Sequence, residues 1–178
     1  IYKTIDVVSK TLSNVVNKEI VELINSNGAN AIGISNKENK FIKARKYTSD
    51  KADYGYVGEI TNIDANHFCK LMDSNYIPVI APLGFDENNN VYNINADSAA
   101  SKIASELAAE KIIFLTDQQG VLNNKKELIS SLNYKEINTL IEKEVITGGM
   151  LPKIKACLDA INNNVKMAHI VDGRIQHS

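Results

Sequence analysis

A pair of glycines followed by a lysine is the feature of this sequence best suited to phosphate chemistry. The run VITGGMLPK occupies residues 145–153, and its two adjacent glycines would let an anion approach the backbone closely. We predict that a helix begins here, capped by Thr147 and with Pro152 in its first turn. A helix start carries partial positive charge, and Lys153 adds a full charge within about one turn. The segment therefore predicts a phosphate site; the alternative is a glycine hinge beside a solvated lysine.

A second polar segment, YNINAD at residues 92–97, leads into a run rich in alanine and serine. Asn93, Asn95 and Asp97 alternate with apolar residues, so in an extended chain they would share one face. That face would offer amide donors to a substrate carboxylate, together with a carboxylate able to hold a lysine in place. The alternative is a simple helix cap, because Asn and Asp are favoured at that position.

A third candidate, TDQQGVL at residues 116–122, follows a short apolar run. Thr116 and Asp117 could hydrogen-bond the ribose or another group of a nucleotide, while Val121 and Leu122 could pack against its base. An ordinary turn that contains a glycine accounts for the pattern equally well.

Familiar catalytic and metal-binding patterns are missing from the sequence. It contains no GxxxxGK[ST] loop and no protein-kinase HRD or DFG set. Neither His67 nor His169 has partners at ligand spacing, which argues against a zinc site or a histidine triad. His169 falls in an apolar run and is predicted to be a buried core histidine. Cys69 and Cys157 fall in apolar helical patterns and are predicted to be buried, reduced thiols.

The bulk composition points to an enzyme or binding protein for small molecules. With 178 residues, of which 44% are hydrophobic, the chain can bury a core of about one domain. Charged residues make up 23% and the net charge is −1, so there is no electrostatic footprint for nucleic acid or an anionic membrane. No apolar run approaches the length of a membrane span, and we expect a soluble cytoplasmic protein.

Apolar periodicity predicts alternating strands and helices. Strands are expected at residues 31–35, 41–45, 56–61, 76–82, 111–116 and 166–171. Helices are expected from residue 12 to a stop at residues 27–28, after a cap at residue 64, and at residues 98–110, 134–144 and 150–162. Residues 41–45 alternate as one arm of a β-hairpin does, and residues 76–82 have the composition of a strand buried on both faces. The helix that Asp64 caps should bury Phe68, Leu71 and Met72. This alternation predicts a mainly parallel sheet covered on both faces, with ligands at the carboxyl ends of its strands.

Five segments together resemble the acetylglutamate kinases of the amino-acid kinase family. They match in order and spacing, and they are residues 16–20 (VNKEI), 55–60 (GYVGEI), 76–82, 92–97 and 146–150 (ITGGM). The resemblance spans essentially the whole chain. It implies a single amino-acid kinase domain over residues 1–178, incomplete at both ends. The implied fold is α/β, a three-layer α/β/α sandwich around a mainly parallel central sheet, plus a β-hairpin.

The same resemblance implies an activity and partners. The enzyme would use ATP with Mg²⁺ to phosphorylate the γ-carboxylate of N-acetyl-L-glutamate, the second step of arginine biosynthesis. A cytoplasmic homo-oligomer, either a dimer or an assembly of dimers, is implied, with no nucleic-acid or membrane partner. The family's N-terminal phosphate loops and closing strand have no counterpart in this sequence, so we expect these residues alone to be inactive. Two alternatives are a kinase for an aminoadipate-type substrate and a non-catalytic nucleotide or amino-acid sensor.

Carried over by position, the resemblance gives roles to individual residues. Asn93 would grip the acetylglutamate with Asn95 beside it, and Asp97 would position catalytic lysines. Lys153 would stabilise charge on the transferred phosphoryl group. The nucleotide would be bound by Thr116, Asp117, Gln118, Gln119, Gly120, Val121, Leu122, Val145, Ile146, Thr147, Gly149 and Met150.

Overall fold

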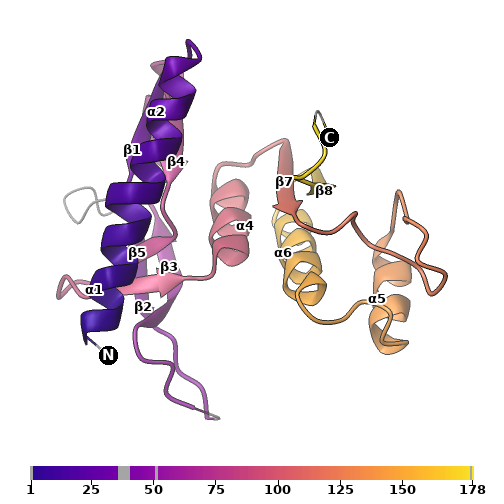
Figure 1. Ribbon diagram of the computed structural model, residues 1–178. Helices are drawn as coiled ribbons and strands as arrows, with labels where there is room; N and C mark the ends of the chain where they lie inside the picture. The colour runs from indigo at the N-terminus through magenta and orange to yellow at the C-terminus, as the bar shows by residue number, and fades with distance from the viewer. Residues whose placement is uncertain (1, 36–40, 51, 177) are drawn as a thin grey trace. The chain divides into compact units, whose positions relative to one another are not determined.

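The computed structural model describes residues 2–35, 41–50, 52–176 and 178. The chain divides into two compact units, Ile1–Ala99 and Ala100–Ser178, and each is considered by itself. Helices and strands alternate in both (Figure 1), and parallel strand pairs occur in both. The prediction of an α/β protein with parallel sheets is therefore confirmed.

The first unit opens with a long helical stretch. It consists of α1 Tyr2–Lys10, the π-helical segment η1 Thr11–Asn17 and α2 Lys18–Ser26. The predicted stop is confirmed, because Gly28 adopts φ +85° and its N–H donates to the carbonyl of Asn25 over 3.1 Å. The π-helical segment was not predicted. It ends at Asn17, which is buried and whose Nδ2 donates to the Val79 carbonyl over 2.8 Å, so the helix is tied to a strand beneath it.

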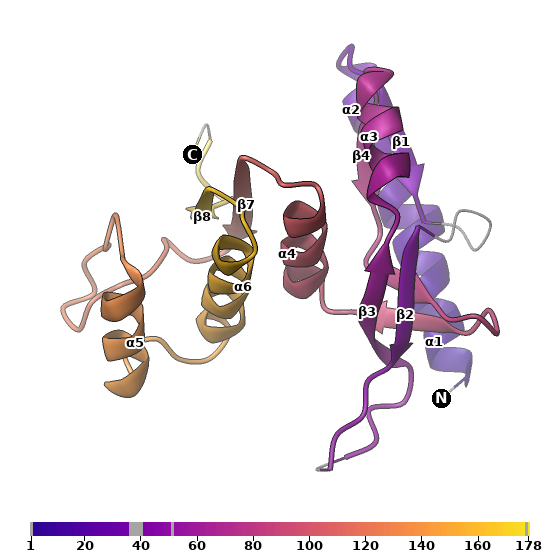
Figure 2. The same ribbon diagram turned by 180° about the vertical axis from the view of Figure 1, so that it is seen from behind.

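Strands of the first unit form two sheets. Strand β1 Ala31–Ile34 pairs in parallel with β4 Ile77–Ile80. The small closed barrel contains β2 Ile42–Lys46, β3 Val57–Ile63, β6 Val91–Ile94 and β5 Leu83–Phe85, in that order. The predicted hairpin arm is β2, and its partner is the antiparallel β3, which lies beside it in Figure 2.

Helix α3 Ala65–Asp73 shows where apolar periodicity misled the prediction. Its cap is confirmed, since the Asp64 carboxylate accepts from the His67 N–H over 3.1 Å. Phe68 is fully buried, as predicted, whereas Leu71 is only half-buried. Met72 is 43% exposed and Cys69 is also exposed, so both burial predictions are wrong. A nine-residue surface helix buries only a narrow stripe, and these two side chains fall outside it.

The expectation that residues 76–82 form a strand buried on both faces is also wrong. Strand β4 has only β1 as its strand neighbour among the described residues, and Ile77 is 46% exposed. A two-stranded sheet leaves open edges, so an apolar composition does not guarantee burial.

The second unit is a parallel strand pair with helices. Its elements are the end of α4 Ala96–Glu106, then β7 Lys111–Thr116, α5 Tyr134–Glu142, α6 Met150–Asn162 and β8 Met167–Asp172. Strands β7 and β8 pair in register from Lys111 opposite Met167 to Thr116 opposite Asp172. One face packs on α4 and α6 through a core that includes Ala104, Phe114 and Cys157.

The burial of Cys157 is confirmed, whereas that of His169 is not. His169 lies opposite Ile113 in the strand pair, and Ile113 is 55% exposed. Both side chains are on the face of the sheet away from the core, because successive residues of a strand point to opposite faces. The sequence of an apolar strand shows which residues share a face of the sheet, but it does not show which of the two faces is buried.

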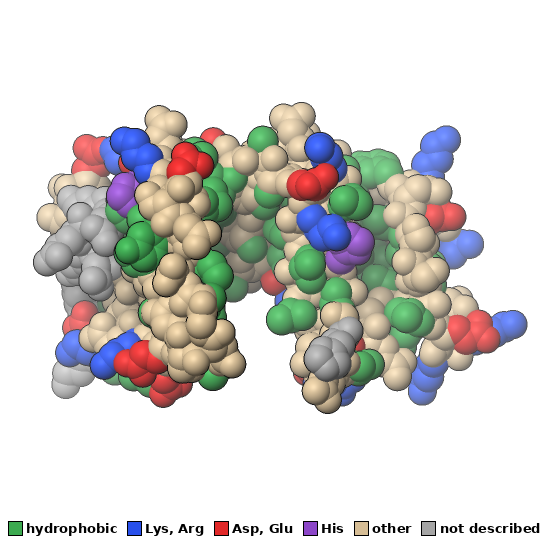
Figure 3. Space-filling model, turned by 90° about the horizontal axis from the view of Figure 1, so that it is seen from above, with side chains coloured by type: hydrophobic (Ala, Val, Ile, Leu, Met, Phe, Trp, Pro, Cys, Tyr) green, Lys and Arg blue, Asp and Glu red, His purple; other side chains and the backbone are tan. Residues whose placement is uncertain are grey.

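The outer surface carries mixed charge. Basic and acidic side chains lie interspersed with hydrophobic and polar ones on the face in Figure 3, in keeping with the net charge of −1. Over the described ranges, every helix is too short or too polar to pass through a lipid bilayer.

Candidate functional site

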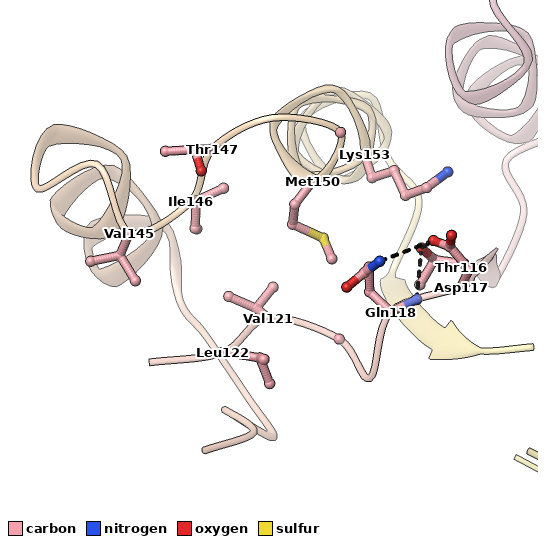
Figure 4. A pocket seen from close by; sticks show the side chains of 12 residues that line it. Thr116, Asp117, Gln118, Val121, Leu122, Val145, Ile146, Thr147, Met150 and Lys153 are labelled. Atoms are coloured by element: carbon pink, nitrogen blue, oxygen red, sulfur yellow. Dashed lines mark hydrogen bonds between the residues drawn. The ribbon is translucent and has the colours of Figure 1, made fainter. Parts of the chain in front are cut away.

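One pocket in the second unit is lined by almost all the residues that the family resemblance suggested for nucleotide binding. Its volume is about 350 Å³. Its lining consists of Thr116, Asp117, Gln118, Gly120, Val121, Leu122, Val145, Ile146, Thr147, Gly149, Met150 and Lys153 (Figure 4). Of the residues predicted for nucleotide binding, Gln119 alone is not part of this lining. Two segments separated by 22 residues of sequence, 116–122 and 145–153, are thus brought to one place at the carboxyl end of β7.

The end of β7 supplies the polar wall of the pocket. Thr116 is the last residue of the strand, and its Oγ1 accepts from the Gln118 N–H over 3.4 Å. The Gln118 side-chain amide donates to Asp117 Oδ1 over 3.3 Å. Lys153, half-buried, projects from the first turn of α6 on the same side of the pocket as Thr116 and Asp117 (Figure 4). An ammonium, a hydroxyl and a carboxylate therefore share one wall.

The opposite side of the pocket is apolar. Val121 and Ile146 are 7% and 3% exposed and belong to a hydrophobic cluster with residues of α5 and α6. Val145 and Leu122 flank them, and the Met150 side chain reaches toward the centre of the pocket (Figure 4). An apolar wall facing a polar one suits a ligand with an aromatic base at one end and charged groups at the other.

The start of α6 differs from its prediction. The N-cap is Gly149, without a side-chain cap, so the expected capping by Thr147 is wrong; Pro152 does lie in the first turn. The N–H groups of Met150 and Leu151 donate to the carbonyls of the turn before them, each over 3.3 Å. Proline has no N–H. Much of the helix N-terminus is therefore already engaged, and the Lys153 ammonium is the main source of positive charge for an anion.

The two glycines of this turn have different conformations. Gly148 has φ +55° and Gly149 has φ −67°, while a Cβ built on either meets no atom within 4 Å. We predict that Gly148→Ala lowers the free energy of unfolding by about 1 kcal/mol, because an L-residue is strained in the left-handed region. Gly149→Ala is expected to stay within about 0.5 kcal/mol of wild type. Urea unfolding measures both, and equal effects would show that backbone conformation is not the cause.

Beside the pocket, β8 ends in an ion pair whose carboxylate is buried and whose guanidinium is exposed. Asp172 is 5% exposed and accepts from the Arg174 guanidinium through Nε over 2.9 Å and through Nη2 over 2.8 Å. The Arg174 backbone N–H adds a third hydrogen bond of 3.0 Å. The guanidinium and then the backbone N–H lower the pKa of Asp172 from 3.8 to about 2. Sequence reasoning missed this pair; its only signal was two opposite charges flanking a glycine after a strand.

The depressed pKa of Asp172 has a consequence for acid stability. The carboxylate stabilises the fold fully above its unfolded pKa, close to 4, and that contribution is lost as the pH falls through about 2. We predict that full-length wild type is more stable than Asp172→Asn at neutral pH. The difference in unfolding free energy should shrink between about pH 4 and about pH 2. Urea titrations across that range measure it, and a difference independent of pH would contradict the assignment.

The residues predicted to bind the acceptor lie in a different setting. Strand β6 ends at Ile94 and α4 begins at Ala96, so Asn93, Asn95 and Asp97 do not follow one extended face, and that prediction is wrong. Asn95 Oδ1 accepts from the Ser98 N–H over 3.0 Å, as in the alternative of a helix cap.

Asn93 and Asp97 occupy different elements. Asp97 is half-buried in the first turn of α4. Asn93 lies in β6 and lines a second pocket of about 350 Å³ in the first unit. The rest of that lining is Thr4, Ile5, Val8, Asp53, Tyr54, Gly55, Tyr56 and Val57.

Metal binding by side chains alone has no support within the described residues. They contain no group of three or more His, Cys, Asp or Glu side chains placed to hold an ion. Asp117 is the carboxylate in the lining of the second-unit pocket. One carboxylate does not form a protein cage, but it is compatible with Mg²⁺ that arrives on a nucleotide and keeps phosphate and water ligands.

Comparison with known proteins identifies the family to which the chain is similar in sequence. A sequence model of the amino acid kinase family matches residues 2–172. An acetylglutamate kinase from Campylobacter hominis is 50% identical over 176 residues, covering 99% of this chain and 62% of that protein. The acetylglutamate kinase of Thiobacillus denitrificans is 48% identical, again with 99% and 62% covered. The chain thus spans about three fifths of the length of these relatives.

Solved structures show the same fold. The smu.665 protein of Streptococcus mutans UA159 is 30% identical, with 92% of this chain and 66% of that chain covered and a TM-score of 0.83. An N-acetylglutamate synthase from Neisseria gonorrhoeae, complexed with coenzyme A and N-acetyl-glutamate, has a TM-score of 0.84 at 21% identity. It covers 96% of this chain and 39% of that chain, and at this identity it supports the fold alone. The match over residues 2–172 and these structures together show that the chain belongs to the amino acid kinase family and has its α/β fold.

Proposed function

We propose that the full-length protein is an acetylglutamate kinase. It would transfer the γ-phosphoryl group of ATP to the γ-carboxylate of N-acetyl-L-glutamate, the second step of arginine biosynthesis. The observation that carries the proposal is the pocket of the second unit, whose lining includes Lys153 and residues of the two segments that we expect to bind the nucleotide. The acetylglutamate kinases that are about 50% identical over nearly the whole chain support the choice of acceptor.

The pocket suggests how ATP would lie. The base would pack on the apolar side formed by Val121, Leu122, Val145 and Ile146, with the ribose toward Thr116 and Asp117. This leaves the phosphates near the start of α6. Lys153 would there neutralise charge that grows on the transferred group in the transition state.

The acceptor would be bound through amides rather than charges. Asn93 can donate to a carboxylate, and the side-chain amide nitrogen of Asn95 can do the same while its Oδ1 caps α4. Asp97 would hold catalytic lysines in position, as the resemblance implies. No protein nucleophile is required, because the substrate carboxylate attacks the γ-phosphate directly and the protein contributes positioning and electrostatics.

Magnesium, location and assembly belong to the same proposal. Mg²⁺ would enter with ATP, with Asp117 as the pocket carboxylate able to help hold it, and would supply positive charge that reduces what Lys153 must offset. A biosynthetic role in making arginine supports a cytoplasmic location. We also propose a homo-oligomer, on the ground of the family resemblance.

A comparison of acceptors tests the proposal. The full-length protein is assayed with ATP and Mg²⁺ against N-acetyl-L-glutamate and against the same acceptor with one more methylene, N-acetyl-L-aminoadipate. We expect kcat/KM to favour the shorter acceptor. Preference for the longer one would instead indicate a kinase of the aminoadipate type. Nucleotide binding without transfer to either acceptor would indicate a sensor and would overturn the proposal.

A further inference from the structure

The turn that follows β8 packs against the carboxyl end of β7, which forms one wall of the nucleotide pocket. Thr116 and Asp172 are opposite each other in the strand pair. The Gly173 N–H donates to the Thr116 carbonyl over 2.9 Å. A Cβ at Gly173 would already lie 3.5 Å from Leu115 Cβ and 3.6 Å from the Thr116 carbonyl oxygen, so the turn fits closely against the end of β7. Any movement of this turn would shift the backbone from which Thr116 and Asp117 enter the pocket.

The Arg174 side chain hydrogen-bonds back to Asp172 and so holds this turn together. Its Nε donates a hydrogen bond to Oδ1 of Asp172 and its Nη2 donates one to Oδ2. The backbone N–H of Arg174 also donates to Oδ1. The two side-chain bonds are the planar fork that arginine forms and lysine cannot. Its acceptor is buried although the guanidinium side chain is 61% exposed, so the fork lies at the boundary between the strand ends and solvent.

Arg174 also lies within electrostatic reach of the pocket wall. Its pKa is raised first by hydrogen bonding to Asp172 and, more weakly, by the negative charge of Asp117. Asp117 is part of the pocket lining, whereas Arg174 is not. The guanidinium is therefore close enough to Asp117 to interact with its charge, although Arg174 does not line the pocket.

We propose that Arg174 is a positioning residue of the nucleotide pocket, which holds the Thr116–Asp117 edge in place through its fork on Asp172 and the Gly173 bridge to β7. The inference rests on the proposed function only in that the pocket binds a nucleotide. It assigns Arg174 no contact with the acceptor and no part in the chemical step. Its loss should weaken nucleotide binding and leave the transfer itself nearly unchanged.

Titration calorimetry with the non-hydrolysable analogue AMP-PNP and Mg²⁺ on full-length protein tests this. We expect Arg174→Ala to raise the Kd by roughly five- to tenfold, the scale of one ordinary hydrogen bond, because the lost bonds act on the pocket only through Asp172 and the Gly173 bridge. In steady state, the KM for ATP should rise similarly and kcat should change less than about twofold. Arg174→Lys keeps the charge without the fork and should weaken binding nearly as much as alanine. It also supplies the measurement if Arg174→Ala does not fold.

A matched control separates positioning from general destabilisation. Ser101→Ala removes the hydrogen bond from the buried Ser101 hydroxyl to Asp159, 2.8 Å long, in the same unit but outside the pocket lining. It should lower Tm and leave the Kd for AMP-PNP unchanged. The proposal is overturned if Ser101→Ala weakens binding as Arg174→Ala does, or if Arg174→Lys binds as wild type does.

The outcome for Arg174 is independent of the acceptor. Wild-type protein that binds AMP-PNP but transfers no phosphate to N-acetyl-L-glutamate would refute the proposed function, while the Kd of each variant would still decide the role of Arg174. Wild-type protein that binds no nucleotide would refute both.

Discussion

Replacing Lys153 by alanine in the full-length protein is expected to lower kcat by roughly 10²–10³, the scale for losing one preorganised group that stabilises transition-state charge. The ammonium comes from the first turn of α6 into a pocket whose other charged lining residue is Asp117. The amides at the helix start are largely engaged in the turn before it, so they are poorly placed to replace Lys153. Steady-state assays at saturating ATP and N-acetyl-L-glutamate measure the change.

Lys155→Ala is the matched control for this prediction. Lys155 lies two residues further along α6, is exposed and is not part of the pocket lining. Its removal takes away the same charge from the same helix, and kcat should stay within about twofold of wild type, as surface substitutions usually do. A Lys153→Ala enzyme with near-normal kcat, or an equal loss in both variants, would refute the role given to Lys153.

Replacing Phe68 by alanine should lower the free energy of unfolding by about 3–5 kcal/mol, the usual cost of deleting a buried phenyl ring. Phe68 is fully buried in α3 and meets Phe41 edge-to-face, with ring centroids 5.9 Å apart. Met72 on the same helix is 43% exposed, and Met72→Ala should cost less than about 1 kcal/mol. Urea unfolding of both variants checks the contrast. Similar losses would mean that the helix is not packed as described.

Secondary structure was predicted well where short-range signals agree. Strand β7 and helix α6 have the predicted bounds, and the cap at Asp64 is confirmed. Apolar alternation and capping chemistry are local, so the sequence contains them in full. The errors at Met72, Ile77 and His169 are of another kind. They concern which side of an element is covered, and that depends on neighbours that periodicity does not identify.

The site shows the same division between local and tertiary information. The resemblance named the nucleotide-binding residues, and the structure brings all but Gln119 to one pocket lining; their roles stay predictions. The prediction that Thr147 caps α6 was wrong because Gly149 is the N-cap residue. The prediction that Asn93, Asn95 and Asp97 share one face was wrong because a helix begins at Ala96. Arg174 is connected to β7 only because β7 and β8 pair as neighbouring strands. A short stretch of sequence does not show which strands pair, so this connection could not be predicted.

Hydrogen exchange of the full-length protein with and without AMP-PNP and Mg²⁺ tests the central claim most directly, because it reports which backbone segments the nucleotide contacts or orders. The second-unit pocket predicts slower exchange within residues 116–122 and 145–153, where its lining lies. Unchanged exchange in both segments under saturating nucleotide, with protection only elsewhere in the chain, would contradict the account.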